Sequence, residues 1–257
     1  MSETPLLRVQ GLTKRFGQRI ACLDVDFELW PGEVLGIVGE SGSGKTTLLR
    51  CIAGQLDVSA GGILFAAHDG IVDLAAIGEA ERRRRIGHDL GFVHQNPRDG
   101  LRLAVSAGAN IAEPLMNGGM RHYGSLRRIA ADWLVRVEID PTRIDDNPRH
   151  FSGGMQQRLQ IARNLVTNPR LVLMDEPTGG LDVSVQARLL DLIRQLAADL
   201  GLAVLLVTHD LGVARLLAHR LMVMQEGRIV EAGLTDQVLD DPHEAYTQLL
   251  VSSVLQL

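Results

Sequence analysis

Aromatic residues are scarce in this sequence, because Phe, Trp and Tyr together make up only 4% of its 257 residues. Surfaces that stack nucleic-acid bases are built from aromatic side chains, and the phosphate backbone attracts basic proteins. With few aromatics and a formal net charge of -5, the chain is not expected to bind nucleic acid. We interpret the arginine run at residues 82–85 as a solvated helix face.

Long apolar runs, export signals and cysteine motifs are also lacking. Stretches such as Leu202 to Val207 fall far short of the roughly 20 residues that cross a bilayer, so no membrane span is expected. The start, Met1 to Pro5, has no basic region followed by an apolar segment. Cys22 and Cys51 lack metal or redox spacing and fit two buried small side chains in a reducing compartment. We therefore expect a cytoplasmic protein.

Apolar runs of strand length alternate with helical patterns along most of the chain, which predicts an α/β fold. A helix is expected from Lys45 onward. The expected strands are residues 6–10, 25–29, 34–38, 62–65, 90–94, 171–174, 203–207 and 221–224. We expect one domain spanning residues 1–257.

Helical periodicity replaces the strand signals between about residues 97 and 168. One apolar stripe with helical spacing consists of Leu126, Ile129, Ala130, Trp133, Leu134 and Val137. A second helical stripe, before the strand at 203–207, consists of Val185, Leu189, Leu192, Ile193, Leu196 and Leu200. The pattern predicts an α/β core from residues 1–96 and 169–257, with an inserted helical lobe at about 97–168.

A phosphate-binding loop is predicted between the strand at 34–38 and the helix that begins at Lys45. The segment Gly39-Glu40-Ser41-Gly42-Ser43-Gly44-Lys45-Thr46 matches the pattern G-x-x-x-x-G-K-[ST] in the context that its mechanism requires. Its backbone N–H groups can surround phosphates at a helix N-terminus. Lys45 is expected to reach the β- and γ-phosphates of a nucleotide, and Thr46 to bind Mg²⁺. The alternative is a glycine-rich turn with an incidental lysine.

Two carboxylates follow the apolar strand expected at residues 171–174, in the segment Asp175-Glu176-Pro177. Acidic side chains at the carboxyl end of a buried strand suit a metal-dependent phosphoryl-transfer site. In this interpretation Asp175 helps to hold Mg²⁺ and Glu176 activates the water that attacks the γ-phosphate. The alternative is an ordinary polar loop after a core strand.

The segment Phe151-Ser152-Gly153-Gly154-Met155-Gln156-Gln157-Arg158 resembles the signature motif of ABC-type ATPases, and further positions match that family in order along nearly the whole chain. Phe16 resembles the aromatic residue that stacks on adenine, and Gln95 resembles the glutamine of the Q-loop. Leu181-Asp182 resembles the D-loop, and His209 resembles the switch histidine. Taken alone, Phe16 would be a core residue, Gln95 surface polar and His209 structural.

The resemblance implies an ATP hydrolase that uses Mg²⁺ and contains an antiparallel β subdomain. It implies catalytic roles for Glu176, His209 and Gln95, with His209 at the γ-phosphate. Mg²⁺ ligation would involve Thr46, Gln95 and Asp175, and Thr47 would join the phosphate-binding residues of the loop.

The resemblance also implies a head-to-tail dimer in which each signature motif closes on the γ-phosphate of ATP held by the other subunit. Ser152, Gly153, Gly154, Met155 and Asp182 would make that contact. Ser152 to Gly154 offer a hydroxyl and open N–H groups at a helix start, although a simple helix cap has the same composition. Met155 stands where the family commonly has glutamine, and Gly179-Gly180 where it has serine-alanine, so the contacts of those side chains are open.

The client of the ATPase is indicated by other segments. Asp241 to Thr247 is similar to the D-P-x-H-P-Y-T segment of peptide and nickel importer ATPases, with Ala245 in place of the proline. The stretch Asn96 to Arg102, where importer ATPases receive their membrane subunit, instead resembles the ATPase subunit of bacterial carbon-phosphorus lyase systems. The segments 105–108, 121–124 and 251–256 carry the same resemblance.

That resemblance implies docking on a carbon-phosphorus lyase core complex, at its radical S-adenosylmethionine subunit, in phosphonate catabolism. A second ABC-type subunit could be the dimer partner in place of a second copy. The alternatives are an importer subunit, and an assembly module that binds ATP with little turnover.

Overall fold

Two sheets organise the chain in the computed structural model, which describes residues 4–85 and 87–254, the side chains of Arg83 and Val254 excepted. A four-stranded sheet has the order β2-β1-β4-β5, and a six-stranded sheet has the order β10-β9-β3-β8-β7-β6. The strands are β1 (Leu7–Phe16), β2 (Arg19–Leu29), β3 (Val34–Val38), β4 (Ala60–Ala67), β5 (Gly70–Asp73), β6 (Leu90–Val93), β7 (Leu171–Asp175), β8 (Ala203–Val207), β9 (Arg220–Gln225) and β10 (Arg228–Leu234).

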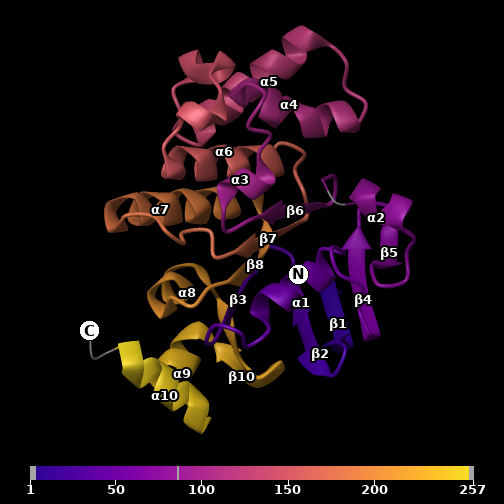
Figure 1. Cartoon of the computed structure of the whole chain (residues 1–257), viewed down its shortest axis with the longest axis vertical. Coiled ribbons are helices and arrows are strands. Elements are labelled where there is room, and N and C mark those ends of the chain that lie inside the picture. The colour runs from indigo at the N-terminus through magenta and orange to yellow at the C-terminus, as the bar shows by residue number, and fades with distance from the viewer. Residues whose placement is uncertain (1–3, 86, 255–257) are drawn as a thin grey trace.

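The helices cover both sheets and form a lobe of their own at one end of the molecule (Figure 1). They are α1 (Lys45–Ile52), α2 (Glu79–Arg85), α3 (Pro97–Gly100), α4 (Ala107–Asn117), α5 (Tyr123–Arg136), α6 (Gly153–Leu165), α7 (Val183–Leu200), α8 (Leu211–Leu217), α9 (Thr235–Asp240) and α10 (Ala245–Val254), with 3₁₀ turns at Pro141–Asp145 and Pro148–His150. Expectations that concern residues 1–3, 255 and 256 lie outside the described residues. None of the described helices is long and apolar enough to span a membrane.

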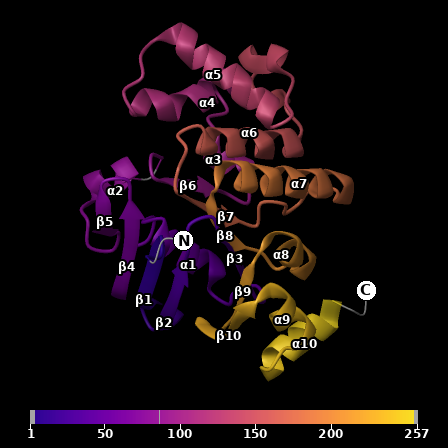
Figure 2. The same cartoon turned by 180° about the vertical axis from the view of Figure 1, so that it is seen from behind.

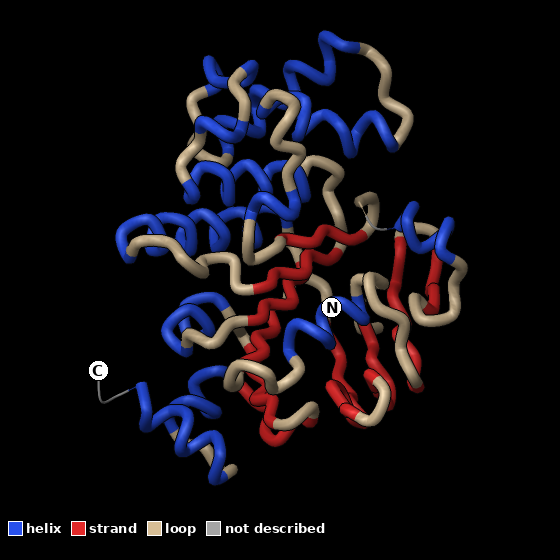
Figure 3. Tube along the Cα trace, viewed as in Figure 1, coloured by secondary structure: helices blue, strands red, loops and turns tan. Residues whose placement is uncertain are grey.

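The strands β3, β7 and β8 form the centre of the six-stranded sheet and are buried along their whole length. Strands covered on both faces need uninterrupted apolar side chains, which explains the continuous runs in the sequence. Strand β8 lies between β3 and β7 and is parallel to both. Its residue Val207 lies opposite Ile37 of β3 on one side and opposite Asp175 of β7 on the other. The loops that follow these three strands therefore leave the same edge of the sheet, which Figure 3 shows as the central red band.

The four-stranded sheet is antiparallel throughout, as the family resemblance implies. Helix α1 lies between the two sheets and contacts strands of both, namely β1, β2, β7 and β8. The views from front and back agree on this placement (Figures 1 and 2). The loop that precedes α1 is thus fixed between two sheets.

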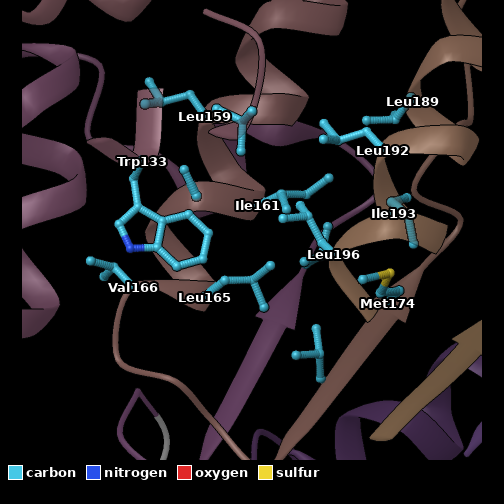
Figure 4. Close-up of a cluster of buried hydrophobic side chains, with 14 of the residues drawn as sticks. Trp133, Leu159, Ile161, Leu165, Val166, Met174, Leu189, Leu192, Ile193 and Leu196 are labelled. Atoms are coloured by element: carbon cyan, nitrogen blue, oxygen red, sulfur yellow. The ribbon is translucent and has the colours of Figure 1, made fainter. Parts of the chain in front are cut away.

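The helical lobe consists of α4, α5 and α6, and Figure 4 shows part of the buried cluster that α5 and α6 share with α7 and β7. Trp133 on α5 faces Leu165 and Val166 at the end of α6, and Ile161 faces Leu192 and Leu196 on α7. Of the stripe predicted for α5, Ile129 is partly buried and the other five members are buried. No strand occurs between residues 97 and 168, all of which the structure describes.

The expected strand list was incomplete, because β5 and β10 were not predicted. Both lie at a sheet edge, where one side of the strand has no neighbour, and every residue of β10 is partly buried or exposed. Edge strands tolerate polar side chains, so their sequences lack the apolar run of central strands. The missed elements are those that burial constrains least.

The interpretation of the arginine run as a solvated face was wrong for two of its members. Arg82 contacts Asp57 at 2.9 Å, and Arg85 contacts Asp89 at 3.1 Å and also pairs with Asp69. Only 16% and 11% of these two arginine side chains are exposed, whereas Arg84 is largely exposed. Helix α2 is attached to the β subdomain through ion pairs.

Candidate functional site

The loop at residues 39–46 joins the end of β3 to the start of α1, as predicted. Gly39 and Gly44 have φ angles of 146° and 108°, which L residues with a side chain rarely adopt. A Cβ on Gly39 would stand 2.1 Å from the carbonyl oxygen of Met224, and one on Gly44 would stand 2.2 Å from that of Ala21. Glycine is required at both places because backbone from both sheets presses on the loop.

The side chain of Lys45 folds back over the loop. Its Nζ donates hydrogen bonds to the carbonyl oxygens of Gly39 at 2.7 Å and Glu40 at 2.8 Å. Burial lowers the pKa of Lys45, while the carboxylates of Glu176 and Asp175 favour its charged form. The ammonium group of Lys45 therefore lies at the loop, where it can bind an anionic ligand.

Asp175, at the end of β7, meets Thr46 at the start of α1. The Thr46 hydroxyl donates a hydrogen bond of 2.9 Å to Oδ1 of Asp175, and only 5% of Asp175 is exposed. Burial raises the pKa of Asp175, since a carboxylate with little water around it is costly to ionise. A hydroxyl and a buried carboxylate beside a phosphate loop are hard oxygen ligands of the type that Mg²⁺ prefers, so the residues fit this ion.

Glu176 lies between two other predicted site residues. Nε2 of Gln95 donates to its Oε2 at 2.9 Å, and Nδ1 of His209 lies 2.9 Å from its Oε1. The backbone of Glu176 has a φ of 43°, a left-handed conformation uncommon for a residue with a side chain and often found at functional sites. Three loops therefore converge on one carboxylate.

The loop of Gln95 is tied to the helical lobe through buried amides. The N–H of His94 donates to Oε1 of Gln160 on α6 at 2.7 Å, and Nε2 of Gln160 donates back to the His94 carbonyl at 3.1 Å. Nε2 of Gln157 donates to the same carbonyl at 3.3 Å. The residue that precedes Gln95 is thus hydrogen-bonded to α6, and these bonds would carry a movement of the helical lobe to Gln95.

The signature segment caps helix α6. Oγ of Ser152 accepts a hydrogen bond from the N–H of Met155 at 3.4 Å, so the segment does form a helix cap. A Cβ on Gly154 would stand 2.5 Å from Cγ1 of Val185 on α7, so a side chain there would force Val185 to move. The sulfur atom of Met155 accepts a hydrogen bond of 3.6 Å from the guanidinium of Arg143 within the same lobe.

Within one chain the signature segment and the phosphate loop are not brought together. The start of α6 lies in the helical lobe, whereas α1 lies between the sheets, and α7 and several strands separate them in both views (Figures 1 and 2). No hydrogen bond between described residues joins segment 152–155 to segment 39–47. The two segments predicted to bind phosphate therefore lie apart within one chain.

The remaining predicted positions lie at the surface or along α1. Phe16 ends β1 at the tip of the β1–β2 hairpin and is 48% exposed, with Nζ of Lys14 at 5.0 Å from its ring centre. The reading of Phe16 as a core residue is therefore wrong. Asp182 is exposed at the start of α7 without a side-chain capping bond, and Thr47 is half-buried in α1.

One contact of the loop was missed by sequence reasoning. The N–H of Glu40 donates a hydrogen bond of 3.0 Å to the hydroxyl of Tyr246 on α10. The signal was present, because Tyr246 belongs to the segment 241–247 that matched importer ATPases. Similarity to importer ATPases indicates relatives but does not reveal which residues meet in the fold.

The family model described as ABC transporter matches residues 22–179 of this chain. A protein of Escherichia coli K12, PhnK, whose name describes it as a phosphonates utilization ATP-binding protein, is 64% identical over 252 residues that cover 98% of both chains. A protein of Brucella ovis, named for ATP binding in peptide import, is 40% identical over 274 residues, covering all of this chain and 80% of the relative.

Solved structures share the fold. The ATP-binding cassette MJ0796, in a dimeric post-hydrolysis state bound to ADP and Pi, has a TM-score of 0.79 and 28% identity, covering 89% of this chain and 98% of that one. The cassette cbiO1 of Clostridium perfringens, part of the complex cbiONQ, has a TM-score of 0.80 and 28% identity, covering 93% and 92%.

Proposed function

Because the chain belongs to the ABC transporter family of ATP-binding proteins, we propose that it hydrolyses ATP in sites that two cassettes share. The observation that supports sharing is the separation of the phosphate loop from the signature segment within one chain. The dimeric state of the related cassette bound to ADP and Pi supports the same arrangement. In this proposal the loop at 39–46 of one subunit faces Ser152 to Met155 and Asp182 of the other.

The chemistry follows from the residues around Glu176. A water oxygen forms a bond to the γ-phosphorus as the bond from that phosphorus to the β-γ bridging oxygen breaks, giving ADP and inorganic phosphate. The Glu176 carboxylate accepts the proton that the water loses. Lys45 and the loop N–H groups hold the phosphates, and Phe16 supplies a ring for the adenine.

Thr46 and Asp175, with Gln95 from the neighbouring loop, would hold Mg²⁺, which neutralises negative charge on the phosphates when it is bound. Glu176 accepts a hydrogen bond from Nε2 of Gln95 and lies 2.9 Å from Nδ1 of His209. If Gln95 turned to Mg²⁺ and His209 to the γ-phosphate, each would free an oxygen of Glu176 to bind the water.

The shared site is tested by mixing two inactive variants. Gly153→Asp places a carboxylate where the partner's phosphate would lie, yet its Cβ meets only Leu181 at an ordinary 3.6 Å. Lys45→Ala removes the phosphate-binding amine. Each variant should be inactive alone. When the two are mixed, random pairing makes half of the dimers mixed, and each mixed dimer has one complete site and one doubly damaged site. ATP hydrolysis should therefore return at roughly a quarter of all sites.

Gly153→Asn is the matched control, since it adds a side chain of the same size without the charge and should retain more activity than Gly153→Asp. A mixture no more active than the sum of its two components would contradict shared sites. A wild-type protein that binds ATP without releasing phosphate would instead support the assembly-module alternative.

We further propose that the ATPase acts on a carbon-phosphorus lyase complex in phosphonate catabolism, docking on its radical S-adenosylmethionine subunit. The 64% identity to a phosphonates utilization protein supports this client, compared with 40% for a peptide-import relative. A cavity of about 420 Å³ lies between the stretch that follows Gln95 and the start of α6. Arg98, Phe151 and Leu181 are among the residues that line it. A partner segment seated there would contact both the stretch after Gln95 and the start of α6.

The client is tested by purifying the tagged chain from phosphate-starved cells and identifying the proteins that accompany it. Recovery of lyase core subunits is expected. Recovery of membrane permease subunits without the lyase core would contradict the proposed client and favour the importer alternative. The same experiment distinguishes a second copy of this chain from a second ABC-type subunit as the dimer partner.

A further inference from the structure

Helix α10 reaches the phosphate-binding loop through the side chain of Tyr246. Tyr246, in the first turn of α10, accepts the hydrogen bond of 3.0 Å from the N–H of Glu40. Its ring packs on the apolar cluster that includes Val38, the residue directly before the loop. Elements more than 200 positions apart in the sequence therefore meet at the start of the loop.

The first part of the loop is held from two directions. Lys45 binds the carbonyl oxygens of Gly39 and Glu40 from inside the loop, and Tyr246 binds the N–H of Glu40 from outside. Ser43 donates its N–H to the Glu40 carbonyl at 3.2 Å. The peptide groups on both sides of Glu40 are thus held by contacts within the chain itself.

The position of Tyr246 is itself fixed by an anchor at the start of α10. The Glu231 carboxylate on β10 accepts hydrogen bonds from the N–H groups of His243 at 2.9 Å and Glu244 at 3.2 Å. Partial burial works to raise the pKa of Glu231, but hydrogen bonds to its carboxylate outweigh it and lower the pKa. Gln248 closes the same turn by donating to the Pro242 carbonyl at 2.9 Å. These contacts attach the turn that carries Tyr246 to β10.

We propose that Tyr246 is a positioning residue for ATP binding, which holds the phosphate loop in its binding conformation and couples α10 to the nucleotide. The inference rests on the proposed role of residues 39–46 as the phosphate site. A loop that is already ordered loses less conformational entropy when the ligand binds. By thermodynamic linkage, bound ATP should in turn hold α10 more firmly.

The test variant is Tyr246→Phe, which keeps the ring and removes only the hydroxyl acceptor. The Kd and the KM for ATP should rise by about 3- to 10-fold, the typical effect of one lost hydrogen bond. The kcat at saturating ATP should stay at the wild-type value, because the hydrogen bond acts equally on bound substrate and transition state. The melting temperature without nucleotide should also stay close to wild type, because the ring keeps its packing.

The matched control is Tyr123→Phe, the same change at the chain's other tyrosine, which is 72% exposed at the start of α5. It should leave both Kd and KM unchanged. A second readout is amide hydrogen exchange in α10, which ATP should slow in wild type and in Tyr123→Phe but not in Tyr246→Phe.

An unchanged Kd in Tyr246→Phe, or an equal effect of ATP on α10 exchange in both variants, would overturn the inference. A lowered kcat with unchanged KM would also overturn it, since the hydroxyl would then act on chemistry instead of on the loop. If wild-type protein itself fails to bind ATP, the proposed function fails, and that outcome is distinct from a failure of Tyr246.

Discussion

His209 places its Nδ1 2.9 Å from Oε1 of Glu176, although 33 positions separate the two residues in the sequence. The contact exists because β7 and β8 are adjacent and parallel, so that the loops after them leave the sheet side by side. Gln95 completes the arrangement from the loop after β6, the neighbour of β7 on its other side. Sheet order therefore determines which side chains surround the carboxylate.

Replacing Glu176 by glutamine removes the proton acceptor and keeps the size of the side chain. We expect ATP hydrolysis to fall by about 10²- to 10⁴-fold, the typical contribution of a positioned general base, while ATP still binds. Phosphate release and a nucleotide-binding assay measure the two effects. Glu138→Gln is the matched control, because Glu138 also has a positive φ, of 56°, but lies in the helical lobe. Equal turnover in both variants would exclude Glu176 as the base.

Asp175→Asn should raise the melting temperature of the nucleotide-free protein while abolishing Mg²⁺-dependent ATP binding. Burial raises the pKa of Asp175, so the folded chain holds its proton more tightly than the unfolded chain does. Stability from this group is present below the unfolded pKa and is lost as the pH rises through the folded pKa. At neutral pH the ionised carboxylate thus costs stability, which the neutral amide avoids.

Thermal unfolding from pH 4 to pH 8 checks this prediction. The melting-temperature difference between Asp175→Asn and wild type should grow as the pH rises, and added Mg²⁺ and ATP should stabilise only the wild type. Asp132→Asn, at an exposed position on α5, serves as the control and should follow the wild type. If the wild type became more stable relative to Asp175→Asn as the pH rose to neutral, that result would contradict the conclusion that ionised Asp175 lowers stability.

The central strands could be predicted from the sequence because burial on both faces requires a run of apolar residues. The runs at 34–38, 171–174 and 203–207 match β3, β7 and β8 to within one residue. Strand β10 has no such run, since an edge strand with partly exposed side chains is not required to be apolar. A strand is therefore predictable where several of its side chains are buried and apolar, as in the partly buried β1, β2 and β4, and it is missed where none is buried, as in β5 and β10.

The site could be predicted only in part, for a similar reason. A motif names the residues of one loop, so the loop at 39–46 and the pair Asp175-Glu176 were found. The contacts among Gln95, Glu176 and His209 depend on strand order, which local patterns do not contain. Phe16 was read alone as core because most aromatics are buried, but its place at a hairpin tip exposes it.

The two cysteines should be unreactive in the folded protein. Burial raises the pKa of the Cys22 thiol to about 12 and that of Cys51 to about 11, so hardly any thiolate is present at pH 8. The thiolate is the nucleophile, and labelling by a disulfide reagent should therefore be about 10²- to 10³-fold slower than in denaturant. Absorbance of the released thiol follows the reaction. Rapid labelling of both thiols in the native protein would contradict their burial.

Arg98 is the better test of the partner surface than Arg102. Arg102 contacts Glu113 at 3.0 Å, and Glu113 also contacts Arg163 at 2.8 Å, so a glutamate at position 102 would disturb the lobe itself. Arg98 is exposed in α3, and its guanidinium has no ion pair within the described part of the chain.

If the stretch after Gln95 docks the partner, Arg98→Glu should weaken the complex with lyase core subunits by at least about 10-fold, because a like-charge contact at an interface costs several kcal/mol. ATP affinity should not change. Arg128→Glu reverses the same charge at another exposed position, on α5, and should leave the complex intact. The two variants are compared by co-purification and by titration of the isolated proteins. Equal partner affinity in both would place the docking surface away from α3.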